Sequence, residues 1–194
     1  MAGISRRQAV AKLLKGRSRL LVVAGLGAPA WDCAAAGDHD LNFYLWGGMG
    51  SAAMVGLGLA LAQPSYSVVV VTGDGEMLMG LSSLATIAVM APRNLTIVVL
   101  DNERYGETGM QQTHTAHGAD LARIADGAGF SWTTRVENLK DADVIGPKLH
   151  ESQGPGLAVL KVAAEKLPLV LPPRDGALLK DRFRQALLER EAER

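Results

Sequence analysis

The sequence predicts a doubly wound α/β domain, in which helices cover both faces of a parallel β-sheet. Four continuous apolar segments, typical of strands that are buried on both faces, alternate with segments of helical periodicity. They cover residues 19–25, 67–73, 95–101 and 157–163. A length of 194 residues is sufficient for one sizeable core and short for two ordinary domains, so residues 1–194 are expected to form a single domain.

The amino-terminal half is expected to alternate strands and helices. Residues 1–20 place basic and apolar residues at helical spacing, and the first strand is followed by a loop. The Gly- and Ala-rich segment 50–62 predicts a helix that can approach its neighbours closely. After the second strand, residues 76–91 predict a longer helix. Its apolar residues at helical spacing are Leu78, Leu81, Leu84, Ala85 and Ala88.

The carboxyl-terminal half is expected to continue this alternation. Beyond the third strand, the predicted elements are a helix over 119–130, a strand over 131–137, a helix over 139–152, the fourth apolar strand and a helix over 175–194. Gly146-Pro147 is expected to interrupt the second of these helices, since proline disfavours a helix interior. The last helix is charged and amphipathic, with an apolar stripe that is expected to contact the rest of the domain.

Composition limits the ligands, cross-links and cellular location that are expected for this chain. Twenty basic residues balance 20 acidic ones, so the net charge favours neither nucleic acid nor an anionic membrane. A single cysteine, Cys33, excludes an internal disulfide or a multi-thiolate metal cluster built from this chain alone. No apolar run reaches membrane-spanning length, and the amino terminus lacks the apolar core of a signal peptide. We therefore expect a cytoplasmic protein.

The segment GLGAPA, residues 25–30, fits a dinucleotide-binding pattern but lacks its usual context. Pro29 falls in its middle, no helix clearly follows it, and no second strand ends in an acidic residue at the distance the motif requires. We interpret the segment as a glycine-rich turn after a strand. A nicotinamide cofactor is therefore not expected.

Asp74 and Asn102 follow consecutive predicted strands. Asp74 lies in a GDG turn after 67–73, and Asn102 follows 95–101, with one predicted helix between them. A right-handed crossover would place both side chains at the carboxyl edge of the sheet, about 5 Å apart if the strands are neighbours. A phospho-acceptor receiver domain also has an aspartate at such an edge. It requires an acidic pair after the first strand, and AGLGAP contains none.

The oxygen atoms at this edge suit a magnesium ion that also binds phosphate. One carboxylate, one amide and a backbone carbonyl are hard ligands with too little charge to bind a bare Mg²⁺ tightly, and Mg²⁺ usually completes its octahedron with water and phosphate oxygens. The helix expected to begin near Glu76 presents free N–H groups there, and Gly75 allows a phosphate to approach the backbone. The sequence thus predicts a diphosphate bridged to Mg²⁺.

Residues 57–75, LGLALAQPSYSVVVVTGDG, and 100–106, LDNERYG, resemble the signature of thiamine diphosphate (ThDP) enzymes, a GDG followed by an NN pair. Asp74 and Asn102 are 28 residues apart, and Asp101 replaces the first Asn of the pair. In the family the second Asn is the metal ligand. The resemblance therefore implies that Asp74, Asn102 and the backbone of Arg104 bind Mg²⁺.

Two further segments strengthen the resemblance. The loop YGETG at 105–109 is similar to that of sulfopyruvate and phosphonopyruvate decarboxylases, in their β subunit or C-terminal half. In WGGMG, Met49 matches the bulky residue that keeps ThDP in its bent form. The Gly47 carbonyl matches the group that accepts a hydrogen bond from the aminopyrimidine of ThDP. Without the resemblance, Met49 would be interpreted as a methionine of the hydrophobic core. Glu76 stands where a small residue is more usual. The implied cofactor contacts are Gly47, Gly48, Met49, Gly73, Asp74, Gly75, Glu76, Asn102, Tyr105, Gly106, Glu107 and Thr108.

The resemblance also implies that part of an active site lies on another chain. ThDP enzymes carry a catalytic glutamate on a separate pyrimidine-binding domain, and 194 residues leave no room for it. We expect a subunit of a 2-oxo acid decarboxylase that is inactive without a pyrimidine-binding (α) subunit and that forms homo- or hetero-oligomers. The alternatives are a subunit of an acetolactate synthase-like ligase or 2-oxoacid oxidoreductase, and a non-catalytic cofactor-binding partner.

His114 is the candidate catalytic residue of this chain. It follows the predicted metal loop in QQTHTAHG, together with His117. An imidazole there could bind an anionic substrate or relay protons. The alternative, a pair of solvent-exposed loop histidines, is about equally consistent with the sequence.

Overall fold

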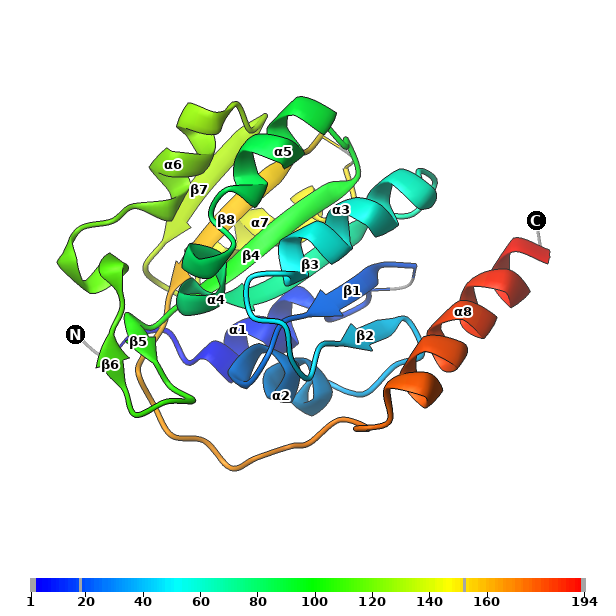
Figure 1. Ribbon diagram of the computed structural model, residues 1–194, viewed down its shortest axis with the longest axis horizontal. Coiled ribbons are helices and arrows are strands. Elements are labelled where there is room, and N and C mark those ends of the chain that lie inside the picture. The colour runs from blue at the N-terminus through cyan, green and yellow to red at the C-terminus, as the bar shows by residue number, and fades with distance from the viewer. Residues whose placement is uncertain (1–2, 18, 152, 193–194) are drawn as a thin grey trace.

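The computed structural model describes residues 3–17, 19–151 and 153–192. Six parallel strands form one sheet in the order β2-β1-β3-β4-β8-β7, and a two-stranded hairpin, β5-β6, lies beside it (Figure 1). The strands are β1 Leu21–Ala24, β2 Asn42–Tyr44, β3 Val68–Gly73, β4 Leu95–Asp101, β5 Arg104–Tyr105, β6 Gln111–Gln112, β7 Trp132–Val136 and β8 Gly156–Lys161.

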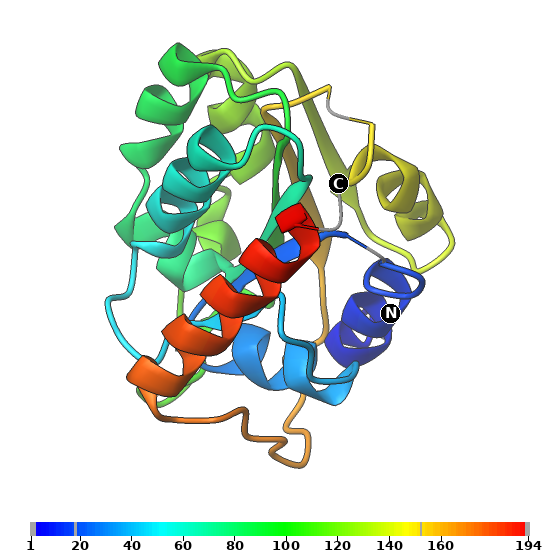
Figure 2. The ribbon, with the colours of Figure 1, turned by 90° about the vertical axis from the view of Figure 1, so that its right-hand side faces the viewer.

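Helices lie on both faces of the sheet, which confirms the predicted fold class. They are α1 Arg6–Leu13, α2 Ala28–Ala35, α3 Ala52–Ala62, α4 Asp74–Met79, α5 Ser83–Met90, α6 Leu121–Ala128, α7 Ile145–Lys148 and α8 Gly176–Ala192, with 3₁₀ turns η1 His114–His117 and η2 Asp141–Val144. Figure 2 shows α3 and α5 on one side of the sheet and α1 and α7 on the other. In the described residues, no helix has both the length and the apolarity needed to cross a bilayer.

Alternate residues of the buried strands contact opposite layers. Along β3, Val69 and Val71 belong to the core formed with α1, α2 and α7, whereas Val68 and Val70 belong to the core formed with α3, α5 and α6. All four valines are at most 1% exposed. Burial on both faces explains why these strands read as continuous apolar runs.

The chain changes direction between β1 and β3. The connection from β1 passes to β2 on one side, whereas the connection from β3 passes to β4 on the other side. In doubly wound sheets, ligands bind in the crevice that such a reversal opens at the carboxyl ends of the strands. Because Gly73 pairs with Leu100 across β3 and β4, Asp74 and Asn102 lie at the same edge, as predicted.

The segment 26–49, which the sequence predicted as a loop, contains a helix and a strand. Helix α2 begins directly after Gly27, so the statement that no helix follows GLGAPA is wrong. Pro29 lies in the first turn of this helix, where a missing N–H is tolerated and the fixed φ of proline suits the helix. Strand β2 ends at Tyr44 rather than at an acidic residue, so the dinucleotide motif is still incomplete.

Two predicted helices differ in extent and continuity from the prediction. The helix over 76–91 begins earlier, at Asp74, and is divided into α4 and α5 at Gly80. A Cβ at Gly80 would lie 2.1 Å from the Gly50 carbonyl oxygen, so the two backbones cross there in close contact. In the described part of the predicted helix 139–152, which ends at residue 151, the chain forms only a 3₁₀ turn and the four-residue α7, and the change occurs at Ile145, just before Gly146-Pro147.

The carboxyl-terminal helix contacts the rest of the domain through its apolar stripe, as predicted. Leu179, Phe183 and Leu187 are each at most 8% exposed. The Phe183 ring meets Phe43 of β2 edge to face, with ring centroids 5.8 Å apart. Figure 2 shows α8 crossing in front of the sheet in red.

Candidate functional site

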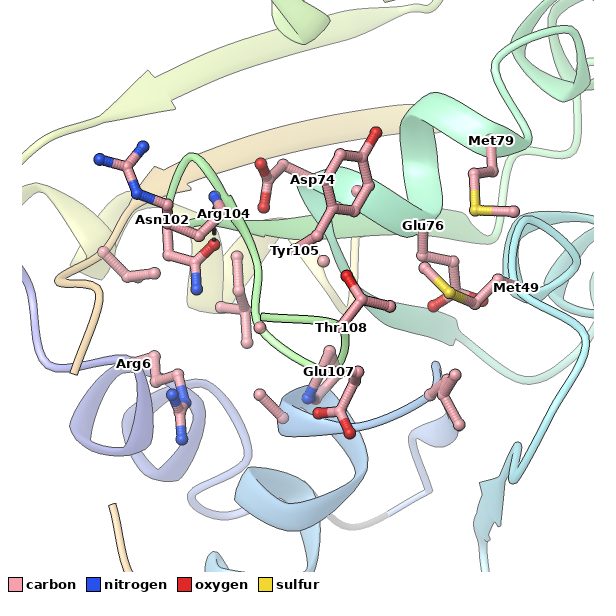
Figure 3. A pocket seen from close by; sticks show the side chains of 18 residues that line it. Arg6, Met49, Asp74, Glu76, Met79, Asn102, Arg104, Tyr105, Glu107 and Thr108 are labelled. Carbon is pink, nitrogen blue, oxygen red and sulfur yellow. Dashed lines mark hydrogen bonds between the residues drawn. The ribbon is translucent and has the colours of Figure 1, made fainter. Parts of the chain in front are cut away.

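A cavity of about 300 Å³ lies at the switch point, at the carboxyl ends of β1, β3 and β4 (Figure 3). Its lining includes every predicted cofactor contact except Gly47 and Gly48, which are exposed in the loop before α3. In Figure 3, Asn102 and Arg104 are on one side of the cavity, and Met49, Met79 and Glu76 are on the other. The remaining lining residues are Arg6, Leu26, Ala28, Pro29, Gly73, Asp74, Gly75, Leu100, Tyr105, Gly106, Glu107, Thr108 and Val162.

Asp74 is buried at the junction of β3 and α4, where it is 1% exposed. Its Oδ2 accepts hydrogen bonds from Thr113 Oγ1 at 2.6 Å and Thr115 Oγ1 at 3.2 Å. Burial raises the pKa of Asp74 to about 6; the negative charge of Asp101 acts in the same direction, while the two hydroxyl groups oppose the shift. A cation at this carboxylate would compensate a charge that the fold alone stabilises poorly.

Asp101 and Asn102, at the end of β4, have different surroundings. Asp101 is 4% exposed and accepts hydrogen bonds from Lys161 Nζ at 2.9 Å and Thr115 Oγ1 at 2.8 Å. Asn102 lines the cavity, and its Oδ1 accepts a hydrogen bond from the Arg104 backbone N–H at 2.9 Å. The amide oxygen retains a second lone pair for a cation.

Thr113 and Thr115 hydrogen-bond to Asp74 but are not among the site residues predicted from the sequence. They are 1% and 7% exposed, whereas His114 between them and His117 after them are exposed. His114 was selected from the sequence because histidine is the residue type most common in proton transfer, but its side chain is exposed. This histidine is not among the residues that line the cavity, and its catalytic role stays a prediction.

Glu76 occupies the interior side of the cavity, where it is 4% exposed. Thr72 Oγ1 donates to its Oε2 at 2.8 Å, and a Cβ at Gly25 would lie 1.9 Å from the same oxygen. Gly25 of the GLGAPA segment therefore provides room for Glu76. Burial raises the pKa of Glu76, although the backbone N–H groups of Leu26, Gly50 and Ala52 partly offset the effect. The other carboxylate oxygen of Glu76, Oε1, is buried and has no partner with good hydrogen-bond geometry within the described residues.

The β5-β6 hairpin lies across the cavity. Tyr105 covers Gly75 so closely that a Cβ at Gly75 would lie 2.6 Å from its ring carbons. Glu107 approaches Gly27 in the same way, since a Cβ at Gly27 would lie 2.5 Å from Glu107 Oε1. Gly27 also has a φ of +76°, which favours glycine. These glycines allow the hairpin to approach both strand ends.

The charges of the cavity fit an anion only if a cation accompanies it. Three carboxylates line it, those of Asp74, Glu76 and Glu107, against the guanidinium groups of Arg6 and Arg104. Arg6 already pairs with Asp32 at 2.7 Å. Across the part of the chain that the structure describes, no group of three or more His, Cys, Asp or Glu residues could bind a metal ion. A metal ion at Asp74 would therefore depend on additional ligands such as phosphate oxygens.

In doubly wound α/β proteins, a cavity at the switch point is where ligands such as dinucleotides and FMN bind. Residues 27–162 match the family model for the "Thiamine pyrophosphate enzyme, C-terminal TPP binding domain"; thiamine pyrophosphate is another name for ThDP. The chain therefore belongs to the thiamine pyrophosphate enzymes, and the predicted family is confirmed.

Two relatives and one solved structure illustrate the similarity. The chain is 42% identical over 121 residues to the sulfopyruvate decarboxylase subunit beta of Methanocaldococcus jannaschii, covering 62% of this chain and 63% of that one. It is 38% identical over 153 residues to the phosphonopyruvate decarboxylase of Streptomyces hygroscopicus, covering 79% of this chain and 38% of that one. The thiamine diphosphate-dependent 4-hydroxybenzoylformate decarboxylase of Rhodococcus jostii RHA1 shares the fold, with a TM-score of 0.67 and 20% identity, over 86% of this chain and 34% of that chain.

Proposed function

We propose that the chain is the ThDP- and Mg²⁺-binding subunit of a 2-oxo acid decarboxylase and works with a separate pyrimidine-binding subunit in the cytoplasm. The observation that carries the proposal is the placement of Asp74 and Asn102 at neighbouring strand ends, on a cavity lined by all the predicted cofactor contacts except Gly47 and Gly48. The names of the relatives support a small 2-oxo acid with a second acidic group as the substrate. The name "subunit beta" supports an α partner.

In this proposal, the chain binds the phosphorylated end of the cofactor. Asp74, Asn102 and the backbone of Arg104 would hold Mg²⁺, whose positive charge would offset the charges of the diphosphate and of the three cavity carboxylates. Gly73 leaves open space at the end of β3, where no atom of the described residues other than its chain neighbours lies within 4 Å of a Cβ position, as a closely approaching phosphate requires, whereas Gly75 makes room for the Tyr105 ring. Mg²⁺ suits this donor set because its ligands are oxygens and it retains positions for water and phosphate.

The other cavity residues orient the cofactor and exclude water. ThDP, when bound, would supply the electron sink that decarboxylation of a 2-oxo acid requires. Met49 would support the bound cofactor, and the Gly47 carbonyl would accept a hydrogen bond from its aminopyrimidine. Tyr105, Glu107 and Thr108 of the hairpin cover the cavity from solvent. His114 is close in sequence to this cover and is proposed to attract the anionic substrate.

The size of the cavity supports a site shared between two chains. Its volume of about 300 Å³ is at the lower end of the range of roughly 300–1,000 Å³ for ligand pockets. The proposal therefore assigns the catalytic glutamate and the pyrimidine end of the site to a partner, in a homo- or hetero-oligomer. The chain also spans less than two thirds of the M. jannaschii subunit.

The proposal is tested by Met49→Ala in the enzyme assembled with a pyrimidine-binding subunit. Met49 is half-buried and lines the cavity. If it supports the bent cofactor, the variant is expected to lower kcat far more than it raises the Kd for ThDP, because the reacting groups must be held close together. Decarboxylation assays and calorimetric ThDP titrations measure the two quantities.

Leu84→Ala provides the control for a purely structural loss. Leu84 is 1% exposed on α5 and does not line the cavity, so its truncation is expected to cost about 2–5 kcal/mol of stability and to leave activity per folded molecule nearly intact. A Met49→Ala variant that behaves like this control, with a lower Tm and unchanged kcat, contradicts the assigned role of Met49.

A further inference from the structure

Two buried hydroxyl groups connect the carboxylates of Asp74 and Asp101. Thr113 Oγ1 lies 2.6 Å from Asp74 Oδ2, and Thr115 Oγ1 lies 2.8 Å from Asp101 Oδ1. The two hydroxyl oxygens are 2.9 Å apart, and Thr115 Oγ1 is 3.2 Å from Asp74 Oδ2. Lys161 Nζ continues the network, because it donates to Asp101 Oδ2 at 2.9 Å.

The number of hydrogen atoms restricts how this network can be arranged. The two hydroxyl groups make four oxygen–oxygen contacts with only two hydrogens between them. The shortest distances assign the Thr113 hydrogen to Asp74 and the Thr115 hydrogen to Asp101. Thr113 is thus the principal donor to Asp74. No hydrogen bond from another described residue reaches Asp74 Oδ1, and the Asp74 side chain lines the cavity.

Thr113 is connected to the remaining predicted metal ligands through the backbone. Its N–H donates to the Glu103 carbonyl at 3.1 Å, one residue from both Asn102 and Arg104. The β5-β6 pairing, in which Arg104 is opposite Gln112, brings the chain back to this point. One residue therefore contacts the Asp74 carboxylate with its side chain and the Asn102–Arg104 turn with its backbone.

We propose that Thr113 and Thr115 are positioning residues of the metal site: they hold Asp74 by Oδ2, leave Oδ1 for the cation, and fix its distance from the Asn102–Arg104 turn. The inference rests on the proposed Mg²⁺ and ThDP binding. Thr113 has the larger effect on metal binding, because its hydroxyl group donates its hydrogen bond to Asp74. Thr115 acts more weakly on Asp74 and chiefly orients Asp101, whose charge Lys161 compensates.

Substitution by valine and serine separates the hydroxyl group from the side-chain shape. Thr113→Val has nearly the same shape without the hydroxyl, and Thr113→Ser retains the hydroxyl without the methyl group. Thr115→Val tests the second position. Thr96→Val is a matched control, since Thr96 is buried at 4% exposure in β4 but pairs with Val69, toward the amino-terminal end of the sheet.

The experiment measures binding of Mn²⁺, which takes the same oxygen ligands as Mg²⁺. The full chain and its variants, each with a pyrimidine-binding subunit present, are titrated with Mn²⁺ at a fixed excess of ThDP, and electron paramagnetic resonance quantifies the free ion. Thr113→Val is expected to weaken Mn²⁺ binding roughly 10- to 100-fold, the usual effect of removing a group that orients a metal ligand. Thr113→Ser is expected to restore most of the affinity, and Thr115→Val to lose less than Thr113→Val.

The outcomes separate this inference from the proposed function. Thr96→Val and wild type are expected to bind Mn²⁺ equally, with thermal melts in metal-free buffer showing that all variants fold. If wild type binds Mn²⁺ with ThDP and both valine variants bind as well as wild type, the positioning role is wrong. Equal losses in the valine and serine variants of Thr113 also contradict it. If wild type binds no Mn²⁺, the proposed function and this inference both fail.

Discussion

The purified chain is expected to release no CO₂ from any 2-oxo acid, and adding a pyrimidine-binding subunit is expected to restore turnover. This chain provides the proposed Mg²⁺ ligands and the diphosphate contacts, but the group that would activate the pyrimidine end is assigned to the partner. The partner is also expected to tighten ThDP binding, because each ligand favours the state that the other requires. A coupled aldehyde assay, with ThDP and Mg²⁺ present throughout, measures the turnover.

Contamination by a partner chain is the main confounding factor in this assay. Mass spectrometry of the preparation checks its purity. A further control is the assembled enzyme without ThDP, which is expected to be inactive. Robust CO₂ release by the pure chain alone would show that it contains a complete active site.

Asp74→Asn is expected to abolish Mg²⁺-dependent ThDP binding and to stabilise the cofactor-free chain. Removing the charge of the one acidic ligand is expected to cost at least about 100-fold in affinity, since removing groups that merely orient a ligand typically costs 10- to 100-fold. Asn102→Ala is expected to weaken binding less, because the amide carries no charge. Calorimetric titration with ThDP in Mg²⁺ buffer measures both losses.

The expected gain in stability follows from the pKa of Asp74, which is raised to about 6 from an ordinary value of 3.8. The folded chain then binds more protons than the unfolded chain between these pH values, so the carboxyl group favours folding at low pH. This contribution is lost as the pH rises through about 6, with a cost of about 3 kcal/mol by pH 7. Asparagine does not titrate, so Asp74→Asn is expected to raise the Tm at pH 7.

The exposed Asp126 on α6 provides the matched control for this variant. Asp126→Asn removes the same charge away from the cavity and is expected to leave ThDP binding unchanged and to raise the Tm at pH 7 by less than Asp74→Asn does. Thermal melts of the three proteins between pH 4 and pH 8, without metal, make the comparison. An Asp74→Asn variant with wild-type affinity for ThDP would remove the metal assignment.

The fold was predictable because its strands are buried on both faces. Predominantly apolar runs, with four consecutive valines in β3, mark β3 and β4, and one crossover between them is sufficient to place Asp74 and Asn102 at the same sheet edge. The short β2 was missed because three residues carry little periodicity. Helix α2 was missed because Pro29 was interpreted as a loop residue, although proline is favoured in a first helical turn.

The details of the site depend on contacts between distant segments, which sequence patterns do not reveal. The division of α4 from α5 follows from the contact between Gly80 and Gly50. Thr113 and Thr115 reach Asp74 only because the β5-β6 hairpin reverses the chain. Local sequence indicates which residues can bind a cation, but tertiary packing determines which groups orient them.

The most direct test of the account is a calorimetric titration of the wild-type chain, with a pyrimidine-binding subunit present, by ThDP in Mg²⁺ and then in EDTA. Thiamine without its diphosphate is the matched ligand control, because the account assigns the binding to Mg²⁺ and the diphosphate at Asp74 and Asn102. The predicted result is ThDP binding in Mg²⁺, none in EDTA, and no binding of thiamine in either buffer. Equal ThDP binding in Mg²⁺ and EDTA would contradict it.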